Sequence, residues 1–279
     1  MAIHDQGYRR YGGHREPHGT AWTVIAMAGL RAVFRRRALL AVLLFAWAPF
    51  FVRAVQIYAA ANFPQAKFLA PTADTFRQFL QQQGIFVFVV SVFVGAGLIA
   101  NDRRANALQL YLSKPLTRAD YVAGKAAILA SLLLFVTWVP ALLLLVVQMA
   151  FAGNLTFLRD HLYLFPAVTV FAFLEVTMIT FAMLALSSLS RNSRFVGIMY
   201  TAFLFFSQAI VAVLAVVTGG TSLSWISFSA DLTQIGDAIF HLPLHYDMPW
   251  PVALLMVLGL MAASCGVLAW RVRGVEVVT

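Results

Sequence analysis

The sequence predicts an all-α, polytopic membrane protein with six transmembrane helices, and three observations lead to this fold class. Of the 279 residues, 61% are hydrophobic and only 11% are charged. Apolar runs near 20 residues, long enough to cross about 30 Å of hydrocarbon, recur along the chain. The Lys and Arg residues gather in alternate gaps between these runs, as the positive-inside rule describes.

The distribution of positive charge predicts the topology. Sixteen of the 20 Lys and Arg residues lie before the first span, in 101–125, in 190–194 or after 270. Both termini are therefore expected in the cytoplasm. The net charge of +9 is explained by this pattern, so it does not indicate a nucleic-acid partner.

The chain is expected to begin with a flexible cytoplasmic tail, residues 1–19, followed by one transmembrane domain, residues 20–279. Thr20 is placed to cap a helix that contains Trp22 and Ile25 and ends in the basic cluster 35–37. An apolar face with a tryptophan, finished by a basic cluster, is typical of a helix in the membrane interface. We expect an elbow that leads into the first span.

The first span is expected at 38–60, with a kink at Pro49. In the loop after it, aromatic and leucine residues at helical spacing predict a short amphipathic helix on the outer face, ending at Gly84. The second span, 85–100, contains Gly95 and Gly97, which allow another helix to approach closely.

The other four spans are expected at 126–149, 165–189, 195–217 and 251–270. The long gap at 218–249 has no Lys or Arg, which fits an outer location. Its residues Trp225, Ile226 and Phe228 favour a short helix or re-entrant piece that enters the interface.

The stretch 101–125 is the longest polar break between two apolar runs. Its residues Leu108, Tyr111 and Leu112 follow i, i+3, i+4 spacing, which predicts one apolar stripe on a short helix. Pro115 ends this helix, because the residue before a proline avoids the α region. Thr117 and Asp120 form a T-x-x-D capping box, which predicts the start of the next helix.

Arg53 and Glu175 are the ionisable residues expected inside spans, where an isolated charge costs about 2.5–3.5 kcal/mol or more. Both are expected at a similar depth below the outer surface, so an intramembrane ion pair is one hypothesis. In the alternative, Arg53 extends outward and Glu175 is protonated or lines a polar cavity.

The outer gap contains Asp237, His241, His245 and Asp247. The first three follow i, i+4, i+8 spacing, which would align metal ligands on one helix face. Pro243 interrupts that helix, so polar loop residues and no metal site are expected.

No sequence motif predicts catalysis by this chain. It contains no G-x-x-x-x-G-K-[ST], H-E-x-x-H or G-x-S-x-G motif. If the protein uses ATP, a different chain must therefore bind it. Cys265 is the sole cysteine, so an intramolecular disulfide is excluded.

The runs 98–104 and 107–118, followed by Asp120-Tyr121 and Gly124-Lys125, resemble the signature of ABC-2-type transporter permeases. In that family an acidic residue ends span 2, and a leucine-rich helix, Ser-Lys-Pro-[Leu/Val]-[Ser/Thr]-Arg and Gly-Lys follow. Asp102 takes the acidic place here, whereas Asn106-Ala107 replaces a Gly-Thr step and Arg104 occupies a commonly acidic position. The residues assigned by this resemblance to coupling with an ATPase are Asp102, Arg103, Arg104, Leu108, Tyr111, Leu112, Ser113, Lys114, Pro115, Arg118 and Lys125.

The resemblance implies the membrane subunit of an ATP-binding cassette transporter in the bacterial cytoplasmic (inner) membrane. It implies a second permease subunit, as a homo- or heterodimer, and two copies of a separate ATP-binding subunit that carries ATP and Mg²⁺. The segment 101–118 would act as the coupling helix, with its apolar stripe in a cleft of the ATPase and its arginines at the rim. The resemblance favours export.

Two other classes stay open on the sequence. One is a secondary transporter or channel that uses the Arg53 and Glu175 pair, and the other is a membrane-embedded enzyme. The substrate is not specified by the motif. The apolar lining that the sequence predicts for the transport path favours an amphipathic or lipid-like cargo, or mechanical work on envelope partners.

Overall fold

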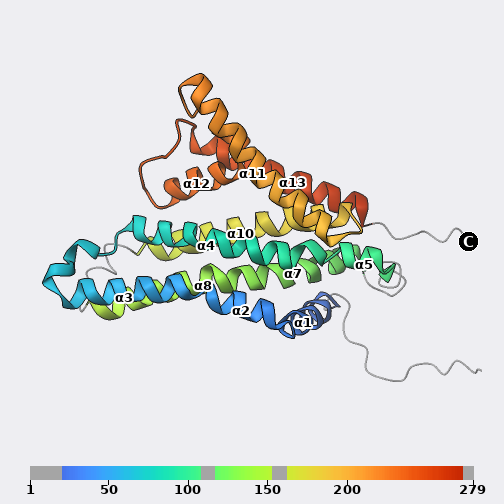
Figure 1. Ribbon diagram of the computed structural model, residues 1–279, viewed down its shortest axis with the longest axis horizontal. Helices are drawn as coiled ribbons and strands as arrows, with labels where there is room; N and C mark the ends of the chain where they lie inside the picture. The colour runs from blue at the N-terminus through green and yellow to red at the C-terminus, as the bar shows by residue number, and fades with distance from the viewer. Residues whose placement is uncertain (1–20, 108–116, 153–161, 273–279) are drawn as a thin grey trace, which may run out of the picture.

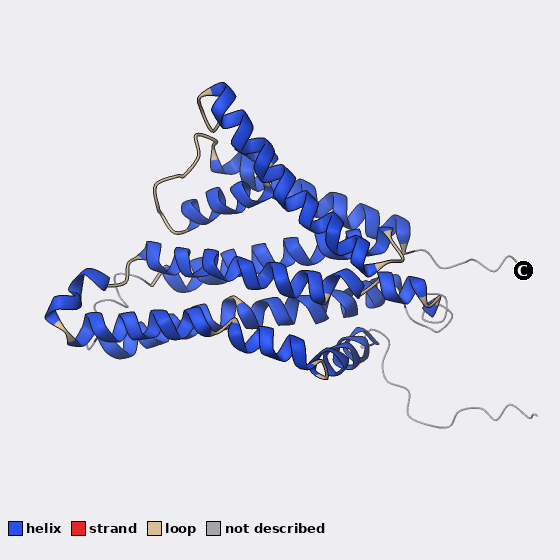
Figure 2. Ribbon diagram, viewed as in Figure 1, coloured by secondary structure: helices blue, strands red, loops and turns tan. Residues whose placement is uncertain are grey.

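The computed structural model describes residues 21–107, 117–152 and 162–272, and within these ranges the chain forms helices, turns and loops without a strand. Figure 2 shows the helices and their connections. The helices, with 3₁₀ turns written η, are α1 (Ala21–Phe34), α2 (Arg37–Phe45), α3 (Ala48–Asn62), η1 (Pro64–Leu69), α4 (Ala73–Phe93), η2 (Gly95–Gly97), α5 (Ala100–Arg104), α7 (Arg118–Val136), α8 (Trp138–Ala152), α10 (Leu164–Leu189), α11 (Ser193–Thr218), η3 (Ser224–Ile226), α12 (Phe228–Ile239) and α13 (Trp250–Arg271). The expected tail, 1–19, lies outside the described residues.

Six helical segments among the described residues are long and apolar enough to cross a membrane. They are Arg37–Asn62, Ala73–Arg104, Arg118–Phe151, Leu164–Leu189, Ser193–Thr218 and Trp250–Arg271. The predicted polytopic helical fold is therefore confirmed.

The helices are arranged around a central layer. In Figure 1, α4, α7, α8 and α10 follow the long axis of the molecule, while α11 leaves it obliquely and α12 lies between α11 and this layer. The share of residues that are buried inside the protein is highest in the α10 span, at 61%, and lowest in the α11 span, at 11%. An apolar helix with so little burial is suited to face lipid or another chain.

Most of the described basic residues lie at one end of the bundle, which we call the basic end. This end carries α1, α5, the start of α7, the α10–α11 turn and the end of α13 (Figure 1). Its arginines are Arg31, Arg35, Arg36, Arg37, Arg103, Arg104, Arg118, Arg191, Arg194 and Arg271.

Prolines break two of the spans. Pro49 lies in the first turn of α3, directly after the break that separates α2 from α3, which confirms the predicted kink. Pro140 lies in the first turn of α8, and α7 ends just before it, at Val136. A proline has no N–H to donate and its ring crowds the carbonyl four residues earlier, so a helix tends to end ahead of it.

The prediction of a separate outer helix ending at Gly84 is wrong. The helix α4 runs from Ala73 through Gly84 to Phe93, so the amphipathic stretch is the first half of the second span. A single glycine is tolerated inside a helix when packing holds both sides. Here Phe76, Phe79 and Leu80 are fully buried, and this burial holds the first half of α4.

The second span breaks at η2, where the predicted close approach of helices is confirmed. A Cβ added at Gly95 would lie 2.6 Å from Met183 of α10 and 2.9 Å from Leu129 of α7. Only glycine leaves room for these two side chains at the break. The helix resumes as the short α5.

Candidate functional site

The end of α5 and the start of α7 are joined through one carboxylate at the basic end. Asp102 Oδ2 lies 2.6 Å from Lys125 Nζ, and it accepts a hydrogen bond of 2.8 Å from Tyr121 Oη. Lys125 and Tyr121 lie one helical turn apart on α7, so both reach the same acceptor. Lys125 also lies over the Tyr121 ring, 5.6 Å from its centroid.

The capping box predicted at the start of α7 is confirmed. Asp120 N donates to Thr117 Oγ1 at 3.1 Å, and Asp120 Oδ2 accepts from Thr117 N at 3.3 Å. The two side chains also bond directly, with 2.6 Å between Thr117 Oγ1 and Asp120 Oδ2. This cap satisfies N–H groups at the helix start and fixes where the chain turns into α7.

Ser187 of α10 holds the break in the second span. Its hydroxyl accepts hydrogen bonds from Ile99 N (3.1 Å) and Ala100 N (3.0 Å) and donates to Ala96 O (2.9 Å). These backbone groups lose their helical partners at the break, and a buried unpaired group is costly. Beside them, the Arg103 guanidinium donates to Ser188 O.

The helix α1 packs on α7 at the same end. A Cβ added at Gly124 would lie 2.8 Å from Ile25 Cβ and 3.0 Å from Trp22 O, so the two helices touch only because this residue is glycine. The Gly-Lys pair of the sequence motif thus has two structural roles, because Gly124 admits α1 and Lys125 binds Asp102.

The structure describes some of the residues expected to contact an ATPase. Asp102 and Lys125 are brought together, Arg103 is turned to the end of α10, and Arg104 and Arg118 are exposed. The others, Leu108, Tyr111, Leu112, Ser113, Lys114 and Pro115, lie outside the described residues.

The ion pair between Asp102 and Lys125 borders a cleft of about 890 Å³ at the basic end. Residues from α1, α4, α5, α7 and α11 and from the α1–α2 turn line this cleft, among them Arg36 and Arg194. The ion pair between Asp102 and Lys125 is therefore accessible through this cleft from the basic end of the bundle.

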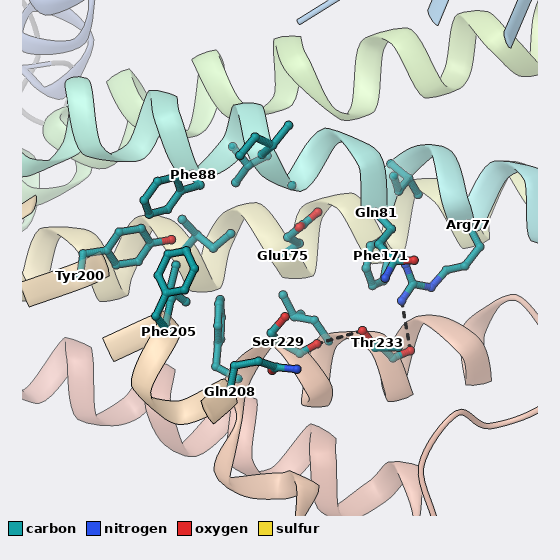
Figure 3. Close-up of a pocket in the computed structure, with 18 residues that line it drawn as sticks. Arg77, Gln81, Phe88, Phe171, Glu175, Tyr200, Phe205, Gln208, Ser229 and Thr233 are labelled. Carbon is teal, nitrogen blue, oxygen red and sulfur yellow. Dashed lines mark hydrogen bonds between the residues drawn. The ribbon is translucent and has the colours of Figure 1, made fainter. Parts of the chain in front are cut away.

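A second feature is a cavity of about 410 Å³ between α4, α10, α11 and α12. Figure 3 shows its walls, with Arg77 at one end, Glu175 in the middle and the rings of Phe88, Tyr200 and Phe205 at the other end. The sequence did not predict this cavity, because its walls come from four segments that are distant in the chain.

Arg77 fixes α12 against α4. Its Nε lies 3.3 Å from Asp237 Oδ1, its Nη2 donates to Thr233 O at 3.2 Å, and its guanidinium carbon lies 4.9 Å from the centre of the Phe171 ring. Gly236 leaves the space for this guanidinium, which a Cβ there would clash with. Burial raises the pKa of the Asp237 carboxyl, while Arg77 and the backbone of His245 act in the opposite direction.

The hypothesis of an ion pair between Arg53 and Glu175 is wrong. Arg53 donates to Gln56 Oε1 (3.3 Å) and Gln78 Oε1 (3.4 Å), because α3 packs against α4 and α8. Glu175 instead lies on the wall of a cavity that is mostly apolar, unlike the polar cavity of the alternative hypothesis, and its Oε2 has no hydrogen-bond partner. The cation that shares this cavity is Arg77, which the sequence had placed in a loop.

The four polar residues of the outer gap do not converge. The helix α12 ends at Ile239 and His241 has a φ of 55°, so the i, i+4, i+8 alignment is broken before Pro243. Asp237 pairs with Arg77, and the rings of His241 and His245 lie against Tyr163 and Tyr246. No group of three or more possible ligands gathers among the described residues.

Asp247 has a different role, which is to close the loop between α11 and α13. It accepts hydrogen bonds from Thr221 Oγ1 at 2.7 Å and Thr221 N at 3.0 Å. These bonds lower the pKa of the Asp247 carboxyl, since they favour its charged form.

A comparison of the sequence with protein-family models and with curated proteins finds no match. The function is therefore inferred from the chain's own residues.

Proposed function

We propose that this chain is the membrane subunit of an ATP-driven transporter of the ABC-2 type. A separate ATP-binding subunit, in two copies, would supply the energy, and two membrane subunits would form the path in a bacterial cytoplasmic membrane. The complex would export an amphipathic substrate or perform mechanical work on an envelope partner.

The observation that carries this proposal concerns the segment 103–124, which contains most of the family motif. The residues that flank its two ends bind each other. Asp102 stands before the segment and Lys125 after it, and their side chains meet at 2.6 Å. A push on the residues between them is thereby applied to α5 and α7 together. We call the ion pair between Asp102 and Lys125 the clamp. A segment that is held in this way at the basic end suits a chain that receives force from a soluble partner.

Contacts around the clamp would transmit this force to other helices of the bundle. Ser187 bonds the break between α4 and α5 to α10, which is the most buried span. The helix α1 rests on α7 beside Gly124, so an interfacial elbow and the coupling segment would move with the same helix. Tilting of α7 and α10 relative to α11 would then change access to the membrane interior.

The alternative of a secondary transporter has less support. It relied on a direct pair between Arg53 and Glu175, and these residues have different neighbours in the structure. A dependence of transport on an ion gradient, with no effect of ATP, would favour it again.

The test is co-purification with a P-loop ATPase, to be sought among the products of the neighbouring genes, with ATP hydrolysis as a second readout. A double substitution Leu108→Glu and Leu112→Glu would place charges on the apolar stripe. Because desolvating a charge in an apolar cleft costs several kcal/mol, we expect at least tenfold weaker association or loss of coupled hydrolysis.

The matched control is Leu110→Glu, which adds one charge beside the stripe and is compared with the single variant Leu112→Glu, which adds one charge on it. It is expected to keep at least half of the wild-type association. Equal effects of the two changes, or no association of the wild-type chain with the ATPase, would refute the proposal.

The orientation in the membrane has its own test. In a Cys265→Ala background, single cysteines replace Ala105 at the basic end and Ser222 in the opposite loop, both at exposed positions. A membrane-impermeant maleimide applied to intact spheroplasts should label Ser222→Cys and leave Ala105→Cys unlabelled until the cells are lysed. The reverse pattern would place the clamped segment outside the cell and exclude an ATPase partner.

A further inference from the structure

The cavity between α4, α10, α11 and α12 has no part in the clamp at the basic end, and it has the dimensions of a ligand site. Its volume of about 410 Å³ lies within the range of small-molecule sites, roughly 300–1,000 Å³. Most of its wall is apolar, and a few polar side chains converge on it, including Gln81, Gln208 and Ser229 (Figure 3).

One carboxyl group on the cavity wall, Glu175, makes no direct ion pair among the described residues. Arg77 is paired with Asp237 and bonded to Thr233 O, so its charge is matched. Glu175 is 7% exposed, and its Oε2 has no hydrogen-bond partner. A buried carboxyl oxygen without a hydrogen-bond partner is costly, so a donor that enters the cavity gains by satisfying it.

The aromatic wall next to Glu175 fits a positively charged donor. Phe88 stacks on Tyr200 with ring centroids 6.0 Å apart, and Phe205 meets Phe88 edge-on at 6.4 Å. Ring faces attract ammonium groups and also bury apolar chains. An anionic head group would instead face the Glu175 carboxylate at close range, which is unfavourable.

The rim of the cavity offers a route from the side. Ile85 of α4 and Phe205 of α11 both line it and are 60% and 67% exposed. Both helices belong to candidate membrane spans, so this rim opens toward the surface that lipid would cover. A molecule dissolved in the membrane can enter here without crossing water.

We propose that this cavity binds an amphiphile with an ammonium head group. The head group donates to Glu175, and the apolar part lies among Phe88, Tyr200 and Phe205 toward the rim. This inference does not depend on an ATPase partner, since it rests on the cavity of the isolated chain.

The test measures binding of dansylcadaverine, a fluorescent primary alkylamine, to the purified full chain in a nonionic maltoside detergent. Fluorescence anisotropy, corrected for empty micelles, is expected to saturate at one amine per chain. Octylamine should displace the probe, whereas octanol and octanoate should need at least tenfold higher concentrations. Non-saturable binding, or equal displacement by the three competitors, would overturn the proposal.

Two variants test the site from different sides. Glu175→Gln keeps the shape and removes the charge, and we expect at least tenfold weaker binding. Gly84→Leu keeps Glu175 and fills space, since Gly84 lines the cavity and an added Cβ meets no atom within 4 Å. It is also expected to weaken binding at least tenfold, and it tests the site if Glu175→Gln does not fold.

Each variant has a matched control. Asp74→Asn removes a carboxylate from an exposed position of α4 outside the cavity, and Gly259→Leu adds a side chain to α13, where a Cβ also meets no atom within 4 Å. Both controls should bind the amine within twofold of the wild type. Wild-type affinity of Glu175→Gln, or equal loss in a variant and its control, would assign the binding to the general apolar surface.

Discussion

Two buried ion pairs hold the second span to its neighbours, and they differ in what surrounds them. At the basic end, Asp102 binds both Lys125 and Tyr121. In the opposite half, Arg77 is paired with Asp237, but Glu175 on the cavity wall and Asp231 of α12 each keep one oxygen without a hydrogen-bond partner.

The difference indicates two kinds of function. A carboxylate with matched donors fixes one arrangement of helices, which suits the transmission of force. Buried carboxyls with unmatched oxygens favour binding of a donor or a proton, which suits a ligand site. The basic end therefore fits a mechanical role, and the cavity region fits a recognition role.

The largest expected effect comes from breaking the more buried pair. Arg77→Met leaves Asp237 buried without its cation, and we expect a loss of about 3–5 kcal/mol in the free energy of unfolding. Equilibrium unfolding in mixed micelles measures this, and hydrogen exchange should show α12 opening first. Arg53→Met is the control, expected within about 1 kcal/mol because its bonds to two glutamines are long. Similar losses in both would remove the special role of Arg77.

A smaller loss is expected at the basic end. The Lys125 and Asp102 side chains are 11% and 19% exposed, so Lys125→Met should cost about 2–3 kcal/mol in unfolding free energy. Adding Asp102→Asn should recover part of it, since the amide oxygen still accepts from Tyr121. Arg118→Met, at an exposed position, should change stability by no more than about 0.5 kcal/mol. A double variant no more stable than Lys125→Met would contradict the clamp.

The third substitution tests the break in the second span independently of the ion pair between Asp102 and Lys125. Ser187→Ala removes the acceptor of two backbone N–H groups and the donor to Ala96 O, which should cost about 1–2 kcal/mol. Hydrogen exchange should accelerate at 99–100 in particular. Ser131→Ala removes only a bond within its own helix and should be nearly neutral. Unchanged exchange at 99–100 would show that the hydroxyl does not hold the break.

The smallest expected effect is a pH dependence of stability that comes from Asp231 of α12. Burial raises the pKa of the Asp231 carboxyl to about 7, well above its usual value of 3.8. The folded protein then holds a proton that the unfolded chain releases, so this contribution to stability is full below pH 3.8 and is lost as the pH rises through about 7.

Thermal unfolding between pH 5 and pH 8 gives the measurement, and Asp231→Asn should flatten the fall in stability. Asp247→Asn is the control: the pKa of the Asp247 carboxyl is lowered from its usual value of 3.8, so its stabilisation is lost only as the pH falls below that value, and the slope between pH 5 and pH 8 should not change. An unchanged slope in Asp231→Asn would show that this carboxyl is not the titrating group.

Several local features could be predicted from the sequence because their causes are local. The capping box of Thr117 and Asp120, the breaks near Pro49 and the close approach at Gly95 each depend on a few neighbouring residues. A short helix or re-entrant piece was also expected in the gap 218–249, and α12 is a short helix in this gap, whereas its outer location stays a prediction. The segment boundary at Gly84 failed because tertiary packing of α4 outweighed a single residue's weak helix propensity.

The sequence by itself determined that the chain forms apolar helices that can span a membrane, since length and hydropathy act along the chain. It also identified Asp102 and Lys125 as members of one motif, although not that they touch. The tertiary structure alone decided the partners of the buried charges, which are Arg77 with Asp237 and an open cavity for Glu175. The physical reason is that a buried charge is stabilised by whatever side chains surround it in space, and this surrounding depends on how distant helices pack.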